Sequence, residues 1–248
     1  MKKKLFLFFL PAVILLSISW QIVRKANQVE KEEPMFKTNQ KIISLSQPAT
    51  SSSFSLEKAI ASRRSRREYS KTPLTLKQIS QILWAAQGIT DQEKELRSAP
   101  SAGALYPLEI YLLTGEKGVE ELESGVYHFQ AENFQLKKVL TADLRHDLSR
   151  AALNQSVVNQ APATIIITAL YQRTTEKYGQ RGEQYVHLEA GHVGQNIYLQ
   201  AEALGLGTVV IGAFNDQQLK ELLQLDQEQP LYLMPIGNRQ ETEKQKKE

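Results

Sequence analysis

The sequence predicts an α+β domain in which helices pack on a mixed, mainly antiparallel sheet. Three observations support this fold class. Residues Ala163–Leu170 form an uninterrupted, β-branched apolar run, which is typical of a strand covered on both faces. Val126–Gln130 and Phe134–Leu140 flank a short polar turn and predict a hairpin. Glu183–Leu204 is long enough for a major helix, and Gly205 ends it.

Capping signals and short apolar runs predict the other elements. Ser55 precedes a helix that we expect to reach about Arg64. Thr75 and Gln78 have the spacing of a capping box, which predicts a helix over Leu76–Gln87. The remaining expected elements are strands at Glu109–Thr114, Thr208–Ile211 and Leu231–Pro235, with helices at Asp143–Leu153 and Asp216–Leu223.

The composition is that of an ordinary globular domain. The chain has 248 residues, of which 42% are hydrophobic and 23% charged, so collagen, coiled coil and wholesale disorder are excluded. It contains no cysteine, which excludes disulfides, cysteine-ligated metals and thiolate chemistry. Any redox chemistry must therefore come from a bound cofactor.

The net charge of +3 is unevenly placed. Five basic residues precede the first acidic residue, Glu30, and the remaining 25 basic side chains are outnumbered by 27 acidic ones. The body of the protein is therefore slightly acidic, which argues against a nucleic-acid-binding surface.

The N-terminus carries a membrane signal. Lys2–Lys4 precede an apolar run over Leu5–Val23 of about 19 residues, the length needed to span a bilayer core. A poor cleavage site and the interfacial Trp20 favour an uncleaved signal-anchor over a cleaved signal peptide. The leading lysines favour a cytoplasmic N-terminus and an extracytoplasmic domain, whereas Arg24 and Lys25 oppose it.

The chain accordingly divides into four parts. We expect a membrane anchor or signal peptide over residues 1–25 and a flexible tether over 26–53, within which Lys41–Leu45 can dock as a short strand. The folded domain then covers 54–239, and a charged tail follows over 240–248.

Two superficially promising motifs fail on geometry. Gly205-Leu206-Gly207 leads into a strand, whereas a dinucleotide fingerprint opens a helix. His187 and His192 lie five residues apart on one helix, about 140° from each other, and cannot reach a single metal. We therefore predict no metal site.

Four arginines in five residues, Arg63-Arg64-Ser65-Arg66-Arg67, form the first binding signal. Guanidinium groups this close repel one another, and a bound phosphate would offset the repulsion. A solvated basic face, or a patch on anionic lipid, explains the same pattern.

A second signal is the run of small residues between Ser98 and Pro107, whose backbone can approach a flat ligand closely. A plain loop is the alternative. On the long helix, a stripe of small and apolar residues indicates either core packing or a subunit interface: Ala190, Gly194, Ile197 and Ala201. Glu189 and Asn196, seven residues apart, form a polar pair on one face, for which a structural hydrogen bond is the simplest account.

Five segments in this order, RRSRREY, PSAGALYP, YVHLEAGHVGQN, GLGTVVIGAF and LYLMPIG, resemble the nitroreductase-type FMN oxidoreductases. The resemblance is closest to their SagB-type azoline (thiazole- and oxazole-forming) dehydrogenase branch, and it covers Phe54 to Arg239. It implies a nitroreductase-like α/β sandwich and an intertwined homodimer with FMN at the subunit interface.

The resemblance also implies positions for the cofactor. It assigns Arg63, Arg64, Ser65 and Arg67 to the FMN phosphate and ribityl chain. It places the backbone of Ser101, Ala102, Gly103, Ala104 and Leu105 beside the flavin of the partner subunit. It lays the amides of Ile211, Gly212 and Ala213 near flavin N5, and it leaves Arg239 as a further phosphate contact.

The azoline dehydrogenases carry a Lys-Tyr pair that is assigned to proton transfer. The resemblance places Lys177 and Tyr178 at the position of this pair. Removing a proton from carbon while hydride leaves for N5 needs a positioned base. A charged surface loop is the alternative for this segment.

We therefore expect an FMN-dependent oxidoreductase of SagB-type dehydrogenase character that transfers hydride through flavin N5 to or from a small-molecule substrate. The alternatives are an NAD(P)H-dependent nitro or quinone reductase, a non-catalytic flavin-binding module on the membrane, and a lipid-binding domain without flavin.

Overall fold

A seven-stranded sheet forms the centre of the computed structural model, which describes residues 41–240. The strand order is β1-β6-β5-β4-β7-β9-β8. The strands are β1 (Ile42–Ser44), β4 (Leu108–Thr114), β5 (Gly125–Gln130), β6 (Gln135–Leu140), β7 (Ala163–Ala169), β8 (Leu206–Thr208) and β9 (Gln229–Asn238). Two further strands, β2 (Ile89–Asp91) and β3 (Leu96–Arg97), form a separate small hairpin.

Strand β7 lies in the interior of the sheet, between β4 and β9, and every one of its residues is buried. It pairs with β4 on one side, where Ile110 faces Ile167, and with β9 on the other, where Met234 faces Ile165. An unbroken apolar strand requires cover on both faces, so this strand fixes where the core lies.

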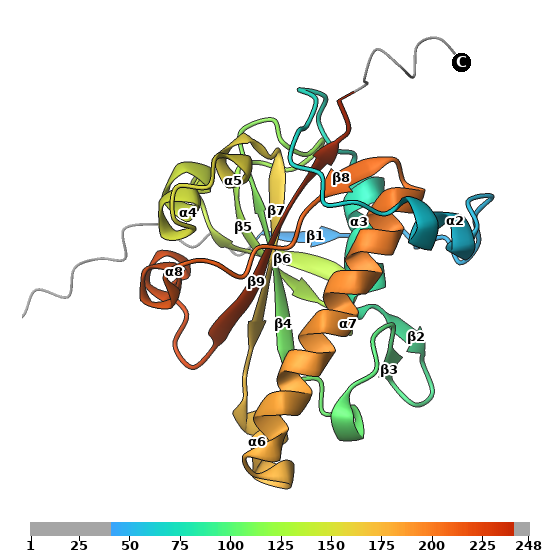
Figure 1. Cartoon of the computed structure of the whole chain (residues 1–248), viewed down its shortest axis with the longest axis vertical. Helices are drawn as coiled ribbons and strands as arrows, with labels where there is room; N and C mark the ends of the chain where they lie inside the picture. Colours follow the sequence, from blue (N-terminus) through green and yellow to red (C-terminus); the bar gives the residue numbers. More distant parts are fainter. Residues whose placement is uncertain (1–40, 241–248) are drawn as a thin grey trace, which may run out of the picture. The chain divides into compact units, whose positions relative to one another are not determined.

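Helices cover both faces of the sheet (Figure 1). Helices α2 (Leu56–Ser62), α3 (Leu76–Gln87) and α7 (Arg181–Ala203) group on one side. Helices α4 (Arg145–Ala151), α5 (Ser156–Gln160) and α8 (Asp216–Leu223) group on the other, and α6 (Gln172–Tyr178) leads into the start of α7.

Helix α7 presents its stripe of small residues to the core. Ala190, Gly194, Ile197 and Ala201 are all buried, and a Cβ added at Gly194 would lie 3.8 Å from the Tyr232 ring of β9. Core packing within the chain therefore accounts for this stripe.

Most predicted elements are present at or near their predicted bounds. The Thr75–Gln78 capping box opens α3, and Gly205, at φ +72°, follows the end of α7. The docking strand expected at Lys41–Leu45 is β1, which pairs with β6.

Three expectations need correction. The sheet is antiparallel at every pairing between its named strands in residues 41–240, not mixed. The strand expected at Thr208–Ile211 lies earlier, at Leu206–Thr208, and Ile211 adds a single bridge to Leu233. The alternative interpretation of the segment around Lys177 was a charged surface loop, but Lys177 lies in helix α6.

Within residues 41–240, none of the helices combines the length and apolar character needed to cross a bilayer. The predicted anchor over residues 1–25, most of the tether, and tail residues 241–248 lie outside the described residues.

A glycine pair tests the packing of this fold. A Cβ at Gly118 would lie 2.0 Å from the Pro162 carbonyl oxygen, whereas a Cβ at Gly191 on α7 meets nothing within 4 Å. We expect Gly118→Ala to lower the free energy of unfolding by about 1–3 kcal/mol in urea titrations. The matched Gly191→Ala should leave it unchanged or raise it by up to about 1 kcal/mol. Equal effects of the two substitutions would contradict this packing.

Candidate functional site

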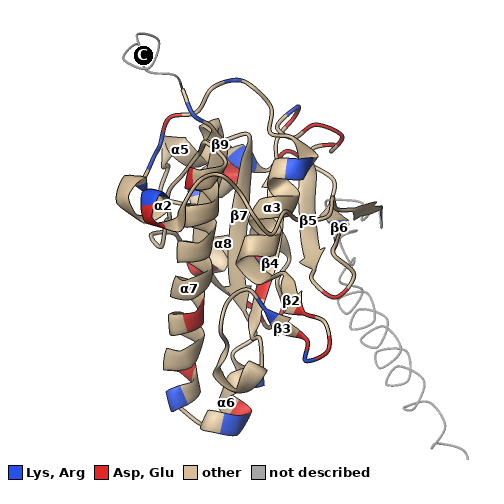
Figure 2. Ribbon diagram, turned by 90° about the vertical axis from the view of Figure 1, so that its right-hand side faces the viewer, with Lys and Arg blue, Asp and Glu red and all other residues tan. Residues whose placement is uncertain are grey.

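The arginine-rich segment leaves the end of α2 and lies beside the C-terminal part of α7 (Figure 2). The Ser65 hydroxyl is 2.9 Å from the Tyr198 hydroxyl, which also accepts a 2.8 Å hydrogen bond from the Val210 amide. The Arg63 guanidinium lies 5.0 Å above the Tyr198 ring. One tyrosine thus ties the arginine segment to the chain that follows β8.

Arg66 differs from its neighbours because it turns inward. Its amide donates to the Thr208 carbonyl, and its guanidinium lies 3.7 Å from the buried Glu202 carboxylate. Arg239 reaches the same carboxylate at 2.6 Å and donates to the Leu206 carbonyl. Burial lowers the pKa of the Arg239 guanidinium although Glu202 opposes this. The predicted phosphate contact Arg239 is thus engaged with Glu202.

The other three arginines keep their charge uncompensated. Within residues 41–240, Arg63, Arg64 and Arg67 form no ion pair with a carboxylate, and Arg64 donates only to nearby carbonyls. Three positive charges beside one hydroxyl therefore remain available to an anion.

The chain after Val210 supplies an exposed backbone stretch next to this cluster. Ile211 is buried and exchanges two backbone hydrogen bonds with Leu233, while Gly212 and Ala213 are exposed. A Cβ at Gly212 would lie 3.6 Å from the Tyr232 ring. The structure therefore brings together two predicted groups, residues 63–67 and 211–213.

The Ser101–Leu105 loop has an unusual backbone. It contains a short 3₁₀ turn over Ala102–Ala104, and φ is left-handed at Gly103 (+65°), at Ala104 (+53°) and, just after the loop, at Tyr106 (+45°). Only glycine adopts this region without cost. The Tyr106 amide donates to the Ser101 hydroxyl at 2.9 Å, which closes the loop.

Lys177 and Tyr178 lie at the end of α6 and face this loop. A Cβ at Gly103 would be 2.7 Å from the Tyr178 hydroxyl oxygen and 2.9 Å from Lys177 Nζ. The structure therefore joins the predicted proton-transfer pair to the predicted flavin-facing loop, although the two lie about 75 residues apart in the sequence.

The site has two halves: an arginine half, formed by residues 63–67 and 211–213, and a loop half, formed by residues 101–105 with Lys177 and Tyr178. The two halves contact α7 at different positions along its axis. Tyr198 of α7 contacts the arginine half, and Tyr185 of α7 packs edge-to-face on Tyr178 in the loop half, with 5.2 Å between the ring centroids. At 1.5 Å per residue, Tyr185 and Tyr198 are roughly 20 Å apart along the helix.

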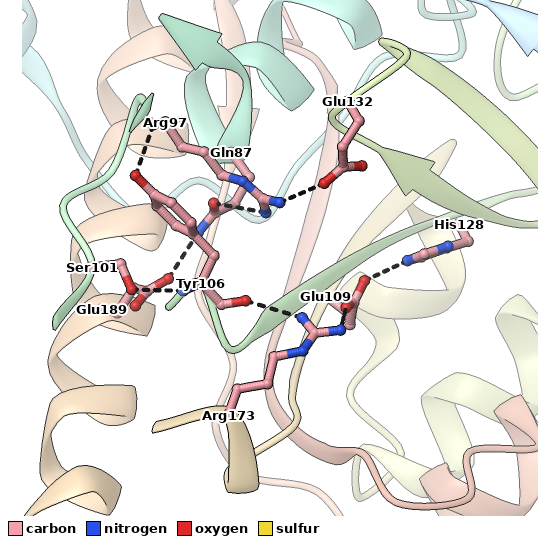
Figure 3. Close-up of polar contacts among 9 residues, drawn as sticks. All are labelled: Gln87, Arg97, Ser101, Tyr106, Glu109, His128, Glu132, Arg173 and Glu189. Atoms are coloured by element: carbon pink, nitrogen blue, oxygen red, sulfur yellow. Dashed lines mark hydrogen bonds and ion pairs between the residues drawn. The ribbon is translucent and has the colours of Figure 1, made fainter. Parts of the chain in front are cut away.

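A polar cavity of about 390 Å³ adjoins the loop half. Arg97 stacks on Tyr106 at 4.7 Å and pairs with Glu132, while Arg173 pairs with Glu109 (Figure 3). Burial alone would raise the pKa of Glu109, but His128, at 2.6 Å, and Arg173 together lower it.

Sequence reasoning missed Tyr198, Tyr232, Arg97 and Arg173. Each acts through partners distant in the chain, and no local spacing indicates such contacts. The sequence predicts a structural hydrogen bond for Glu189 and Asn196, and each makes one: Glu189 accepts from Gln87 at 3.2 Å, and Asn196 donates to the Ser98 carbonyl at 3.3 Å.

The described residues fit FMN in two respects. Three uncompensated guanidinium groups and the Ser65 hydroxyl match the charge and hydrogen-bonding needs of a phosphate. Exposed Gly212 and Ala213 leave their backbone open beside that cluster, where a flat ring can approach.

Comparison with known proteins agrees with this geometry. The family model described as the Nitroreductase family matches residues 60–238. The Methanocaldococcus jannaschii protein MJ1384, named as a nitroreductase, is 48% identical over 184 residues, covering 74% of this chain and 91% of its own. The Escherichia coli Microcin B17-processing protein McbC is 27% identical, covering 63% of this chain and 59% of its own.

A solved structure gives the same result. The crystal structure of a Ralstonia eutropha protein assigned to the nitroreductases superposes with a TM-score of 0.72 at 29% identity. The match covers 86% of this chain and 98% of that one. The resemblance found in the sequence, including its link to the SagB-type branch, is confirmed.

Tyr198→Phe tests the junction of the arginine half. The substitution leaves the ring in place but removes the acceptor of the Val210 amide and the partner of Ser65. We expect the free energy of unfolding to fall by about 1–3 kcal/mol, measured by urea titration. Tyr185→Phe on the same helix is the control, because the Tyr185 hydroxyl has no hydrogen-bond partner in residues 41–240. An equally stable Tyr198→Phe protein would contradict the junction.

Proposed function

The chain belongs to the Nitroreductase family and is an oxidoreductase, and on this premise we propose that it binds FMN and acts as a SagB-type dehydrogenase. The contact of Lys177 and Tyr178 with the Gly103 loop is the observation that carries the dehydrogenase assignment. A base beside the loop that faces the flavin is the arrangement this reaction requires.

The arginine half would hold the cofactor. Arg63, Arg64 and Arg67 bind the phosphate with their free guanidinium groups, and the Ser65 hydroxyl adds a hydrogen bond. The exposed amides of Gly212 and Ala213 donate to the flavin ring. Bound FMN supplies two-electron chemistry, because its N5 accepts or donates a hydride.

Lys177 and Tyr178, at the end of α6, would carry out the proton transfer. In this role the Lys177 amine takes a proton from the substrate carbon, while the Tyr178 hydroxyl holds the reacting group by a hydrogen bond. The helix and the Gly103 loop shield both groups on one side, so that substrate approaches from the other.

We further propose a homodimer. The loop half and the arginine half contact α7 roughly 20 Å apart, and a second subunit that offers its Ser101–Leu105 loop to this arginine half would complete each site. The separation of the two halves within one chain supports this assignment.

We also propose that residues 1–25 anchor the protein in a membrane with the domain on the extracytoplasmic side. The apolar run and the preceding lysines support the anchor and its orientation. In that location, oxygen or quinone would be the electron acceptor, because NAD(P)H is confined to the cytoplasm.

A second candidate is an NAD(P)H-dependent nitro or quinone reductase. The name of the 48% identical relative favours it. Anaerobic mixing with NADPH separates the two functions: bleaching of the bound flavin would favour the reductase, and an unchanged spectrum would favour the dehydrogenase.

FMN binding is the first test. We expect the purified full-length chain, in mild detergent, to be yellow with absorption near 450 nm and to release FMN on denaturation. Arg67→Ala should raise the Kd for FMN about 10- to 100-fold, because it removes one charge-assisted contact to the phosphate. Arg150→Ala, at an exposed position on α4, removes the same charge and should leave the Kd unchanged. A wild-type chain that stays colourless with added FMN would overturn the proposal.

Lys177→Met tests the base. We expect it to slow oxidation of a small thiazoline by about 100- to 10,000-fold at full FMN occupancy, since it removes the group that accepts the proton. Stopped-flow absorbance of the flavin measures this rate. Lys94→Met, in the exposed β2–β3 turn, is the control. Equal rates for the wild type and Lys177→Met would remove Lys177 from the reaction.

A further inference from the structure

The Arg173 guanidinium, in the first turn of α6, joins this helix to two other parts of the chain (Figure 3). Its Nη2 atom lies 2.6 Å from the Glu109 carboxylate of β4. Its Nη1 atom donates at 3.0 Å to the carbonyl of Tyr106, just after the Ser101–Leu105 loop. Within residues 41–240, no other side chain of α6 forms a hydrogen bond or an ion pair with β4 or with residues 101–106. One side chain therefore attaches α6 to both.

Glu109 is held from the side of the sheet. Its side chain is only 16% exposed, and its second carboxylate oxygen lies 2.6 Å from His128 Nε2. Tyr111 faces His128 in the β4–β5 pairing, and Glu109 precedes Tyr111 by two residues, so the three side chains lie on one face of the sheet. Because both of its oxygens are engaged, the carboxylate stays with the sheet and cannot follow α6 if the helix shifts.

An ordinary surface ion pair is arranged differently. Arg150 and Asp147 on α4 form such a pair at 3.5 Å, with 67% and 46% of their side chains exposed, and pairs of this kind contribute little to stability. The Glu109 carboxylate is largely buried, and a buried carboxylate costs stability unless its partners compensate. Apolar side chains in place of a buried pair are often neutral or stabilising. Stability alone therefore does not account for an acid at position 109.

Helix α6 needs neighbours to define its position. It has seven residues, buries one of them and lacks a side-chain cap, and isolated helices this short are not stable in water. Tyr178 packs on Tyr185 of α7, with 5.2 Å between the ring centroids, and Figure 1 shows α6 at the lower end of α7. These contacts attach α6 to α7, but its position relative to the sheet depends on Arg173.

The predicted base lies on the same face of α6 as this arginine. Lys177 follows Arg173 by four residues, which is about one helical turn, and its Nζ atom lies 2.9 Å from a Cβ placed at Gly103. We propose that Glu109 and Arg173 are positioning residues: their ion pair holds α6 against β4 and the loop, and thereby keeps Lys177 in place beside the loop. The role in catalysis rests on the proposed function, whereas the hold on α6 does not.

Hydrogen–deuterium exchange of the full-length chain, in mild detergent and without added FMN, tests the hold on α6. Arg173→Met keeps most of the side-chain stem but removes both contacts. We expect it to speed the exchange of amides in residues 173–179 roughly tenfold, because the helix separates from the sheet more often. Arg150→Met, which removes an arginine from the exposed pair on α4, should leave these amides unchanged. Exchange in Arg173→Met equal to that in the wild type would overturn the inference.

Glu109→Gln tests the same contact from the side of the sheet, and it decides the question if Arg173→Met fails to fold. It keeps the shape of the side chain but removes the charge, so the same amides should exchange about three- to tenfold faster. Adding it to Arg173→Met should give no further increase, because both substitutions remove one interaction. An unchanged exchange rate in Glu109→Gln, or additive effects in the double variant, would show that Glu109 does not act through Arg173.

The reaction itself distinguishes positioning from a merely structural role. At full FMN occupancy, Arg173→Met should slow the oxidation of a small thiazoline about 10- to 100-fold, because the base is displaced from its working position. In a chain that already carries Lys177→Met, the same substitution should slow the reaction no further. An unchanged rate, or equal slowing with and without Lys177, would remove the positioning role. If the wild type binds no FMN, the proposed function fails, and the exchange experiment still decides the hold on α6.

Discussion

The close approach of α7 to β9 is the contact on which the rest of the site depends. At Gly194 the helix lies against the Tyr232 ring and Met234, and the buried stripe on either side of it fixes the rotation of the helix about its axis. With that rotation set, Glu189 and Tyr198 must point where they do. A Cβ alone would fit at this crossing at 3.8 Å from the Tyr232 ring, whereas a side chain larger than alanine would move both halves of the site together.

Electrostatics then divides the basic residues into two groups. Glu202 is buried and accepts Arg66 and Arg239, so the acid nearest the cluster is already engaged by two cations. The remaining three guanidinium groups have no carboxylate partner in residues 41–240 and repel one another in the absence of an anion. The cluster is therefore stable in its present form only at some electrostatic cost, which a bound phosphate would offset.

The sequence was sufficient for elements that local chemistry specifies. The Thr75–Gln78 box defines the start of α3 and the unbroken apolar run defines β7, because capping and burial depend on residues close together in the chain. Helix α6 lacks a side-chain cap, and β8 gains its position from pairing with β9, so neither leaves a clear local signal. The arginine segment was visible from its charge density. The Ser65–Tyr198 bond joins residues 133 positions apart, and only the folded chain brings them together.

Helix α6 couples the loop to the groups it faces. Arg173, in its first turn, holds the Tyr106 carbonyl, and Lys177, one turn later on the same face, lies against Gly103. Any shift of this short helix would therefore move the grip on the loop and the proton-transfer pair together. Because Asn196 of α7 holds the chain just before the loop by donating to the Ser98 carbonyl, the loop spans two helices whose relative position fixes its strained form. The geometry at Gly103 is thus a property of the α6–α7 corner, and the sequence of the loop alone does not determine it.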